Sequence, residues 1–122
     1  MSRVLDLRTA IRGILMTAHP RVYYEDAPKS ATFPYLVYDI PSSFDDGDIE
    51  VFVLDVDGWD DPTAGDTTAL ETLMEAADAA LQRSVINQAG IAAPIYRDSR
   101  LSLNDPDERI IRRKYTYQVR CQ

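Results

Sequence analysis

The sequence contains one histidine and one cysteine among its 122 residues, and each scarcity excludes a class of site. A single cysteine, Cys121, cannot form an internal disulfide, so the fold does not depend on an oxidising compartment. A single histidine, His19, excludes metal sites built on several histidines. A serine–histidine–carboxylate triad would need this residue, which precedes Pro20 and has no nucleophile motif beside it. We therefore expect a helix-end or surface histidine rather than a catalytic base.

Long apolar segments and an excess of positive charge are also lacking. No run of about 18 apolar residues occurs, and the N-terminus has no apolar signal-peptide core, so we expect a soluble protein made in a cytoplasm, without a membrane partner. The 13 Lys and Arg residues stand against 20 Asp and Glu residues, which gives a formal charge of −7. This balance argues against bulk attraction to DNA, RNA or anionic membranes.

The charges that are present are segregated along the chain. Asp39 to Asp66 contains ten acidic residues and no Lys or Arg, whereas Arg97 to Arg120 carries seven of the thirteen basic residues. Such polarity can serve a metal site, a nucleic-acid mimic, or a surface that meets its opposite on another copy of the chain.

Apolar spacing of three and four residues predicts two helices. The first covers Arg3 to Thr17, and Gly13 inside it, which costs about 1 kcal/mol relative to Ala, suggests close packing at that point. The second covers Thr68 to about Gln82 and is the clearest helix of the chain. Thr68 with Glu71 fits a capping box at its start, with Asp66 or Thr67 as alternative caps.

Branched and aromatic residues between turn signals predict the strands. The expected strands and turns are a strand at Arg21–Glu25, a hairpin of Phe33–Ile40 and Ile49–Trp59 with its turn at Asp45–Asp48, and a second hairpin of Ile95–Leu103 and Ile111–Cys121 with its turn at Asn104–Glu108. The stretch from Ser84 to Ala93 is not assigned. The sequence thus predicts one α+β domain, residues 1–122, with an antiparallel sheet of about four to five strands and two main helices packed on one face.

The acidic segment after the central strand resembles a calcium loop only superficially. Its members are Asp55, Asp57, Gly58, Asp60 and Asp61. An EF-hand loop needs its glycine at the sixth position and a Glu at the twelfth. Counted from Asp55, the glycine is fourth and the twelfth residue is Asp66. We therefore expect no metal site and no cofactor here, but a solvated strand end.

Catalytic signatures are missing as well. The five glycines form no phosphate-binding loop, and no pair among the many carboxylates is singled out as an acid and a base. The expectation is that the protein is not an enzyme and has no catalytic residues.

The remaining candidate sites are contact surfaces. Trp59 ends the long strand, either as packing at the core edge or as an aromatic anchor at a subunit contact. Within the last strand Arg112 and Lys114 share one face and Arg113 points to the other. The candidate interface residues are Asp45, Asp46, Asp48, Asp57, Trp59, Asp60, Asp61, Arg112, Arg113 and Lys114. The acids are expected to meet the basic residues of a neighbouring subunit.

Several short motifs carry a resemblance that extends over almost the full chain. They are His19-Pro20-Arg21-Val22-Tyr23, Phe33-Pro34-Tyr35, Ser43-Phe44-Asp45-Asp46-Gly47, Val56-Asp57-Gly58-Trp59-Asp60, Pro106-Asp107-Glu108-Arg109-Ile110 and Arg112-Arg113-Lys114-Tyr115. In these motifs the sequence resembles the tail terminator, or tail-completion, proteins of long-tailed bacteriophages. The resemblance implies an α+β subunit that forms a hexameric ring on a completed tail tube, stops tube polymerisation and joins the head connector. It brings no catalytic residues.

The primary hypothesis is therefore a structural virion protein at the head–tail junction, assembled in the host cytoplasm. Its expected partners are further copies of itself, the tail tube protein and the head–tail connector or stopper, while DNA only passes through the channel. The alternatives are a head-side joining protein of the phage neck (a stopper or adaptor), an acidic inhibitor that mimics DNA, and, last, a metal-dependent enzyme.

Overall fold

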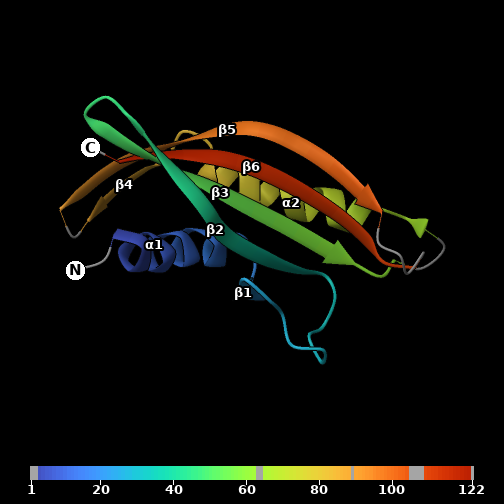
Figure 1. Cartoon of the computed structure of the whole chain (residues 1–122). Helices are drawn as coiled ribbons and strands as arrows, with labels where there is room; N and C mark the ends of the chain where they lie inside the picture. Colours follow the sequence, from blue (N-terminus) through green and yellow to red (C-terminus); the bar gives the residue numbers. More distant parts are fainter. Residues whose placement is uncertain (1–2, 63–64, 89, 105–108, 122) are drawn as a thin grey trace.

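The computed structural model describes residues 3–62, 65–88, 90–104 and 109–121, and Figure 1 shows the arrangement. The elements are α1 (Arg3–Ala18), β1 (Val22–Tyr24), β2 (Tyr35–Asp46), β3 (Ile49–Asp60), α2 (Thr68–Leu81), β4 (Val85–Gln88), β5 (Ile91–Asn104) and β6 (Ile111–Cys121). Within these residues no helix is both long enough and apolar enough to cross a bilayer.

The strands form one curled sheet of six, in the order β1-β2-β3-β6-β5-β4. The prediction of four to five antiparallel strands was therefore wrong in number and in type. β1 pairs with β2 in parallel, and all other neighbouring strands pair antiparallel. The additional strand is β4, which lies in the unassigned stretch and is only four residues long.

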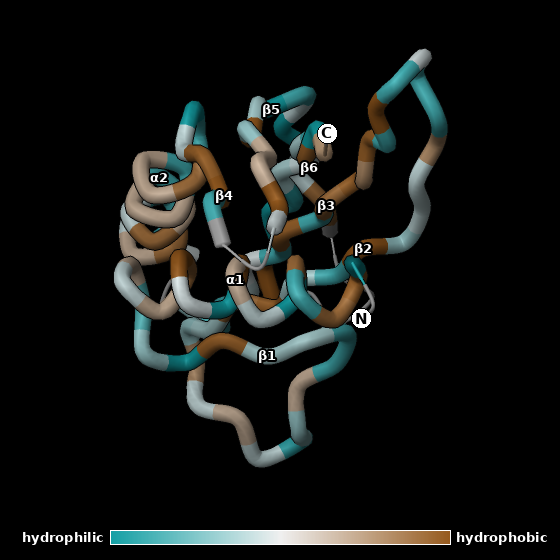
Figure 2. Tube along the Cα trace, turned by 90° about the vertical axis from the view of Figure 1, so that its left-hand side faces the viewer, coloured by the Kyte–Doolittle hydropathy of each residue, from teal (hydrophilic) through white to brown (hydrophobic). Residues whose placement is uncertain are grey.

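Both helices lie on one face of the sheet, as predicted (Figures 1 and 2). We call this the inner face and the opposite side the outer face. α1 buries Leu7, Ile11 and Leu15 against the sheet, and α2 buries a parallel stripe. The strands complete one core with every second residue, among them Leu54 and Tyr117. The apolar stripes of both helices and the inward-facing residues of the strands thus form a single apolar layer.

The β2–β3 hairpin is longer than predicted. β2 continues past Ile40 to Asp46, with an irregularity between Asp39 and Ser42 where Pro41 cannot donate to the ladder. The predicted turn is present: Gly47 has a φ of +65°, which suits the first position of a two-residue hairpin turn. The end of the hairpin stands clear of the helices (Figure 2).

Two local predictions need correction. Gly13 is exposed and has no close neighbour, whereas a Cβ placed on Gly58 would lie 2.5 Å from the sulfur of Met74, so α2 packs close to the sheet there. α2 also begins without the Thr68 capping box, because an Asp66 carboxylate oxygen accepts from the Thr68 backbone N–H at 2.9 Å. The predicted turn at Asn104–Glu108 lies mostly outside the described residues.

The two glycines give a matched pair of substitutions. Gly58→Ala should lower the free energy of unfolding by about 1–3 kcal/mol, because the methyl group overpacks the contact with Met74. Gly13→Ala should raise it by up to about 1 kcal/mol, because Ala favours an exposed helix position. Urea unfolding of both variants checks this, and equal effects at the two sites would contradict the close packing.

Candidate interaction surface

The outer face of the sheet carries five of the residues singled out in the sequence, namely Asp46, Asp57, Trp59, Arg112 and Lys114. No helix of the described chain covers it (Figure 1). Register sets its composition: Asp57 of β3 lies opposite Lys114 of β6, and Trp59 lies opposite Arg112. The acidic segment of the sequence contributes β3 and the basic segment contributes β6, and these two strands are neighbours in the sheet.

Asp57, Trp59 and Arg112 form one cluster. The Arg112 Nη2 donates to Asp57 Oδ2 at 2.5 Å, its Nε donates to the same oxygen at 3.2 Å, and the guanidinium lies 4.7 Å from the centre of the Trp59 ring. Burial raises the pKa of the Asp57 carboxyl, and the hydrogen bonds from Arg112 oppose this rise. Trp59 thus shields a pair whose side chains are only 13% and 27% exposed. A cavity of about 220 Å³ borders the cluster, between it and Glu25.

Other cations of β6 also pair within the chain. Lys114 Nζ lies 3.8 Å from an Asp55 carboxylate oxygen, and an Arg120 guanidinium donates to Asp46 at 3.0 Å. These partners come from β3 and from the end of β2. The outer face is therefore closer to neutral than the segregated sequence indicates. That arrangement lowers the cost of burying the face against a partner, because the charges already have counterions.

The remaining predicted interface residues fall in different places. Arg113 points to the inner face, where its Nε donates to Glu71 of α2 at 2.7 Å. Asp60 is buried on the inner side and accepts the backbone N–H of Asp61 at 2.9 Å. Asp45, Asp48 and Asp61 are exposed, and their carboxylates have no ion pair within the described part of the chain.

The strand geometry also bears on the proposed resemblance to a calcium loop. Asp55, Asp57 and Asp60 lie within β3, where successive residues point to opposite faces, so Asp60 points to the inner face and its carboxylate cannot join those of Asp55 and Asp57 on one ion. Across the described residues no group of three or more metal-ligating side chains comes together.

Sequence reasoning missed a polar network on the inner face. Asp78 of α2 is buried, accepts the Tyr117 hydroxyl at 2.8 Å and pairs with the Arg97 guanidinium at 2.5 Å. Burial, helped by the Asp78 carboxylate, raises the pKa of Tyr117 far above its usual value. A single acid among the alanines of a helix was the available signal. The network ties α2 to β5 and β6.

His19 is placed at the end of α1, as expected, and acts in packing. Its Nε2 donates to the Pro34 carbonyl at 3.0 Å. Burial, together with nearby Arg21, lowers the pKa of His19, and the hydrogen bond to Pro34 opposes the shift.

The sequence matches the family described as tail completion protein gp17 over residues 4–122. The chain belongs to this tail completion family. It is thus a structural protein of a bacteriophage tail, as the sequence motifs indicated.

A solved structure has the same fold as this tail completion protein. This chain resembles a chain of the structure "Virion of native gene transfer agent (GTA) particle", with a TM-score of 0.73 and 15% sequence identity. The similarity covers 94% of this chain and 93% of that chain. At this identity the match shows a shared fold. Comparison with curated protein sequences finds none that matches.

The inner-face network gives a stability prediction. Asp78→Ala should lower the free energy of unfolding by about 3 kcal/mol, because it leaves the Arg97 charge and the Tyr117 hydroxyl without their acceptor. Glu75→Ala on the same helix is the control and should cost less than about 1 kcal/mol, because its side chain is 63% exposed. Denaturant unfolding measures both. Similar losses in the two variants would rule out a special role for Asp78.

The histidine of this tail completion protein gives a pH prediction. Its pKa in the folded chain lies below 6.5, so just below that pH the unfolded chain binds the proton more readily. The free energy of unfolding should therefore fall as the pH is lowered from about 7.5 to about 5.5. His19→Gln should flatten this slope, since no other histidine titrates there. Parallel pH profiles for the two proteins would contradict the assignment.

Proposed function

We propose that this protein closes the end of a completed tail tube as a homo-oligomeric ring, stops tube polymerisation and offers the surface to which the head–tail connector binds. Six copies per ring follow from the resemblance of its motifs to tail terminators. The ring sits at the head–tail junction of the virion and assembles in the host cytoplasm. Its role is structural rather than enzymatic.

The observation that carries the proposal is the uncovered outer face. Phe44, Tyr96 and Leu101 are 48%, 46% and 51% exposed, and strand register puts all three on this face. Neutralised ion pairs lie between them, as on Asp57 and Arg112. Exposed aromatic and aliphatic groups set among ion-paired charges are the composition expected of a contact with other protein chains.

The charge of the chain fits a channel through which DNA passes. A net charge of −7 gives the ring no general affinity for phosphate, so DNA slides past without adhering. The DNA-mimic alternative requires carboxylates spaced along one exposed face without counterions. On this outer face Asp55 and Asp57 each have a cation beside them.

Tube capping can be tested with one substitution on the outer face. Leu101→Glu should leave the melting temperature unchanged, because the side chain is half exposed, and should abolish binding to tail tubes. Met16→Glu, at a 41% exposed site on α1, is the matched control and should bind normally. Light scattering after size exclusion, with and without tubes, measures assembly, and electron micrographs measure tube length.

The same assay separates the function from its rivals. A protein that stays monomeric on tubes and leaves tube length unchanged contradicts the proposal. Cross-linking to the portal rather than to the tube protein would instead identify a head-side stopper or adaptor.

A further inference from the structure

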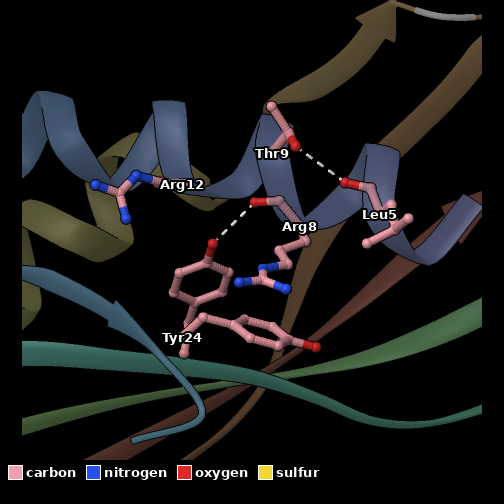
Figure 3. Close-up of a pocket in the computed structure, with 6 residues that line it drawn as sticks. Leu5, Arg8, Thr9, Arg12 and Tyr24 are labelled. Atoms are coloured by element: carbon pink, nitrogen blue, oxygen red, sulfur yellow. Dashed lines mark hydrogen bonds between the residues drawn. The ribbon is translucent and has the colours of Figure 1, made fainter. Parts of the chain in front are cut away.

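A pocket between α1 and the strands β1 and β2 is built for a negatively charged partner. Its volume is about 300 Å³, and its lining residues are Leu5, Arg8, Thr9, Arg12, Tyr24 and Tyr38. Figure 3 shows Arg8 bent over the aromatic residues while Arg12, one helical turn further on, extends along the helix. No acid is among the lining residues. We call this site the α1 pocket.

The aromatic wall holds the first arginine in place. The Arg8 guanidinium lies 4.2 Å from the centre of the Tyr24 ring, and the Tyr38 hydroxyl donates to the Arg8 carbonyl at 2.9 Å. The rings of Tyr24 and Tyr38 pack edge to face, 5.1 Å apart. Burial, together with the nearby carboxylates of Glu25 and Asp39, raises the pKa of Tyr24, and both lining arginines lie on the α1 side of the pocket. Ordered guanidinium groups bind carboxylates at little cost in side-chain entropy.

The other half of a contact lies at the end of the β2–β3 hairpin, residues 44–48, which we call the hairpin tip. Phe44 is exposed beside the turn, and the Asp45 and Asp48 carboxylates are exposed without an ion pair in the described part of the chain. The tip projects away from the helices of its own chain (Figure 2). It thus presents an aromatic ring and carboxylates, the groups that a pocket of arginine and tyrosine accepts.

The basic strand β6, which the sequence suggested as the counterpart of these acids, already has partners in the chain. Arg112 pairs with Asp57 at 2.5 Å and Arg113 with Glu71 at 2.7 Å. Binding a neighbour's hairpin there would require exchanging one ion pair for another, with little gain. Arg8 and Arg12 of α1 make no ion pair within the described residues, so a neighbour's carboxylates can bind there without displacing an existing partner.

We propose that the hairpin tip of one copy docks into the α1 pocket of the next. The tip and the pocket are different surfaces, so the contact is heterologous and repeats from copy to copy, as a closed ring requires. Asp45 and Asp48 meet the guanidinium groups of Arg8 and Arg12, and Phe44 covers the aromatic wall. The inference rests on the proposed ring and names the contact that builds it.

Complementary charge reversals test the contact. Asp45→Lys/Asp48→Lys reverses the charge of the tip, and Arg8→Glu/Arg12→Glu reverses the charge of the pocket. In each variant alone like charges then face each other, so it should self-associate at least about tenfold more weakly. An equimolar mixture of the two pairs the intact tip with the intact pocket and the lysine tip with the glutamate pocket, so opposite charges meet at both contacts and the mixture should assemble more strongly than either variant alone. Asp98→Lys and Lys29→Glu, at exposed sites elsewhere, are matched controls and should assemble like the unmodified chain.

Light scattering measures these species, and circular dichroism checks that each variant folds. If the unmodified chain needs a template, the same proteins are compared on tail tubes. Unchanged assembly of either double variant, or a mixture that assembles no better than the separate variants, overturns the contact.

A second arm uses cysteines on the tube-bound protein. Thr9→Cys with Asp45→Cys in one chain should give a ladder of disulfide-linked multimers, and Thr9→Cys with Asp98→Cys should not. No ladder, with tubes still capped at normal length, overturns the contact and leaves the proposed function standing. A ladder without any effect on tube length overturns the function and leaves the contact standing.

Discussion

The close approach of α2 to β3 at Gly58 holds the helices to one face of the sheet. With no side chain on the strand at that point, Met74 and Leu70 pack against the backbone, and α1 joins α2 over the same core. The polar groups of the inner face must then find partners inside the protein, which the network around Asp78 provides. The outer face is left to water or to another protein. Because the helices cover only the inner face, the outer face remains accessible for contacts with other proteins.

On that outer face, acidic and basic residues form pairs instead of patches of one sign. β3 and β6 are neighbours in the sheet, so acids and bases that are distant in sequence lie side by side, as in Asp57 with Arg112. Trp59 stacks on that arginine and limits its contact with water. A surface of paired charges and scattered exposed apolar groups is suited to binding chains of complementary shape. This is consistent with a tail completion protein, whose task is assembly.

Exposed charges without an ion pair are informative where an aromatic group lies beside them. Asp45 and Asp48 at the hairpin tip, and Arg8 and Arg12 on α1, are exposed and unmatched by ion pairs within the described chain. They sit on separate elements, with opposite sign and with aromatic groups beside each set. Heterologous assembly needs such a pair of different, complementary surfaces on one subunit.

The sequence by itself determined both helices, the central hairpin with its turn at Gly47, and the pattern of buried residues, because these follow from local periodicity and turn chemistry. Its motifs also indicated the family. It did not determine the short strand β4, whose four residues are below any periodic signal, nor the close approach at Gly58. Only the tertiary structure decided which charges meet. Strand order is fixed by packing between distant segments, and it places Arg112 beside Asp57 of its own chain.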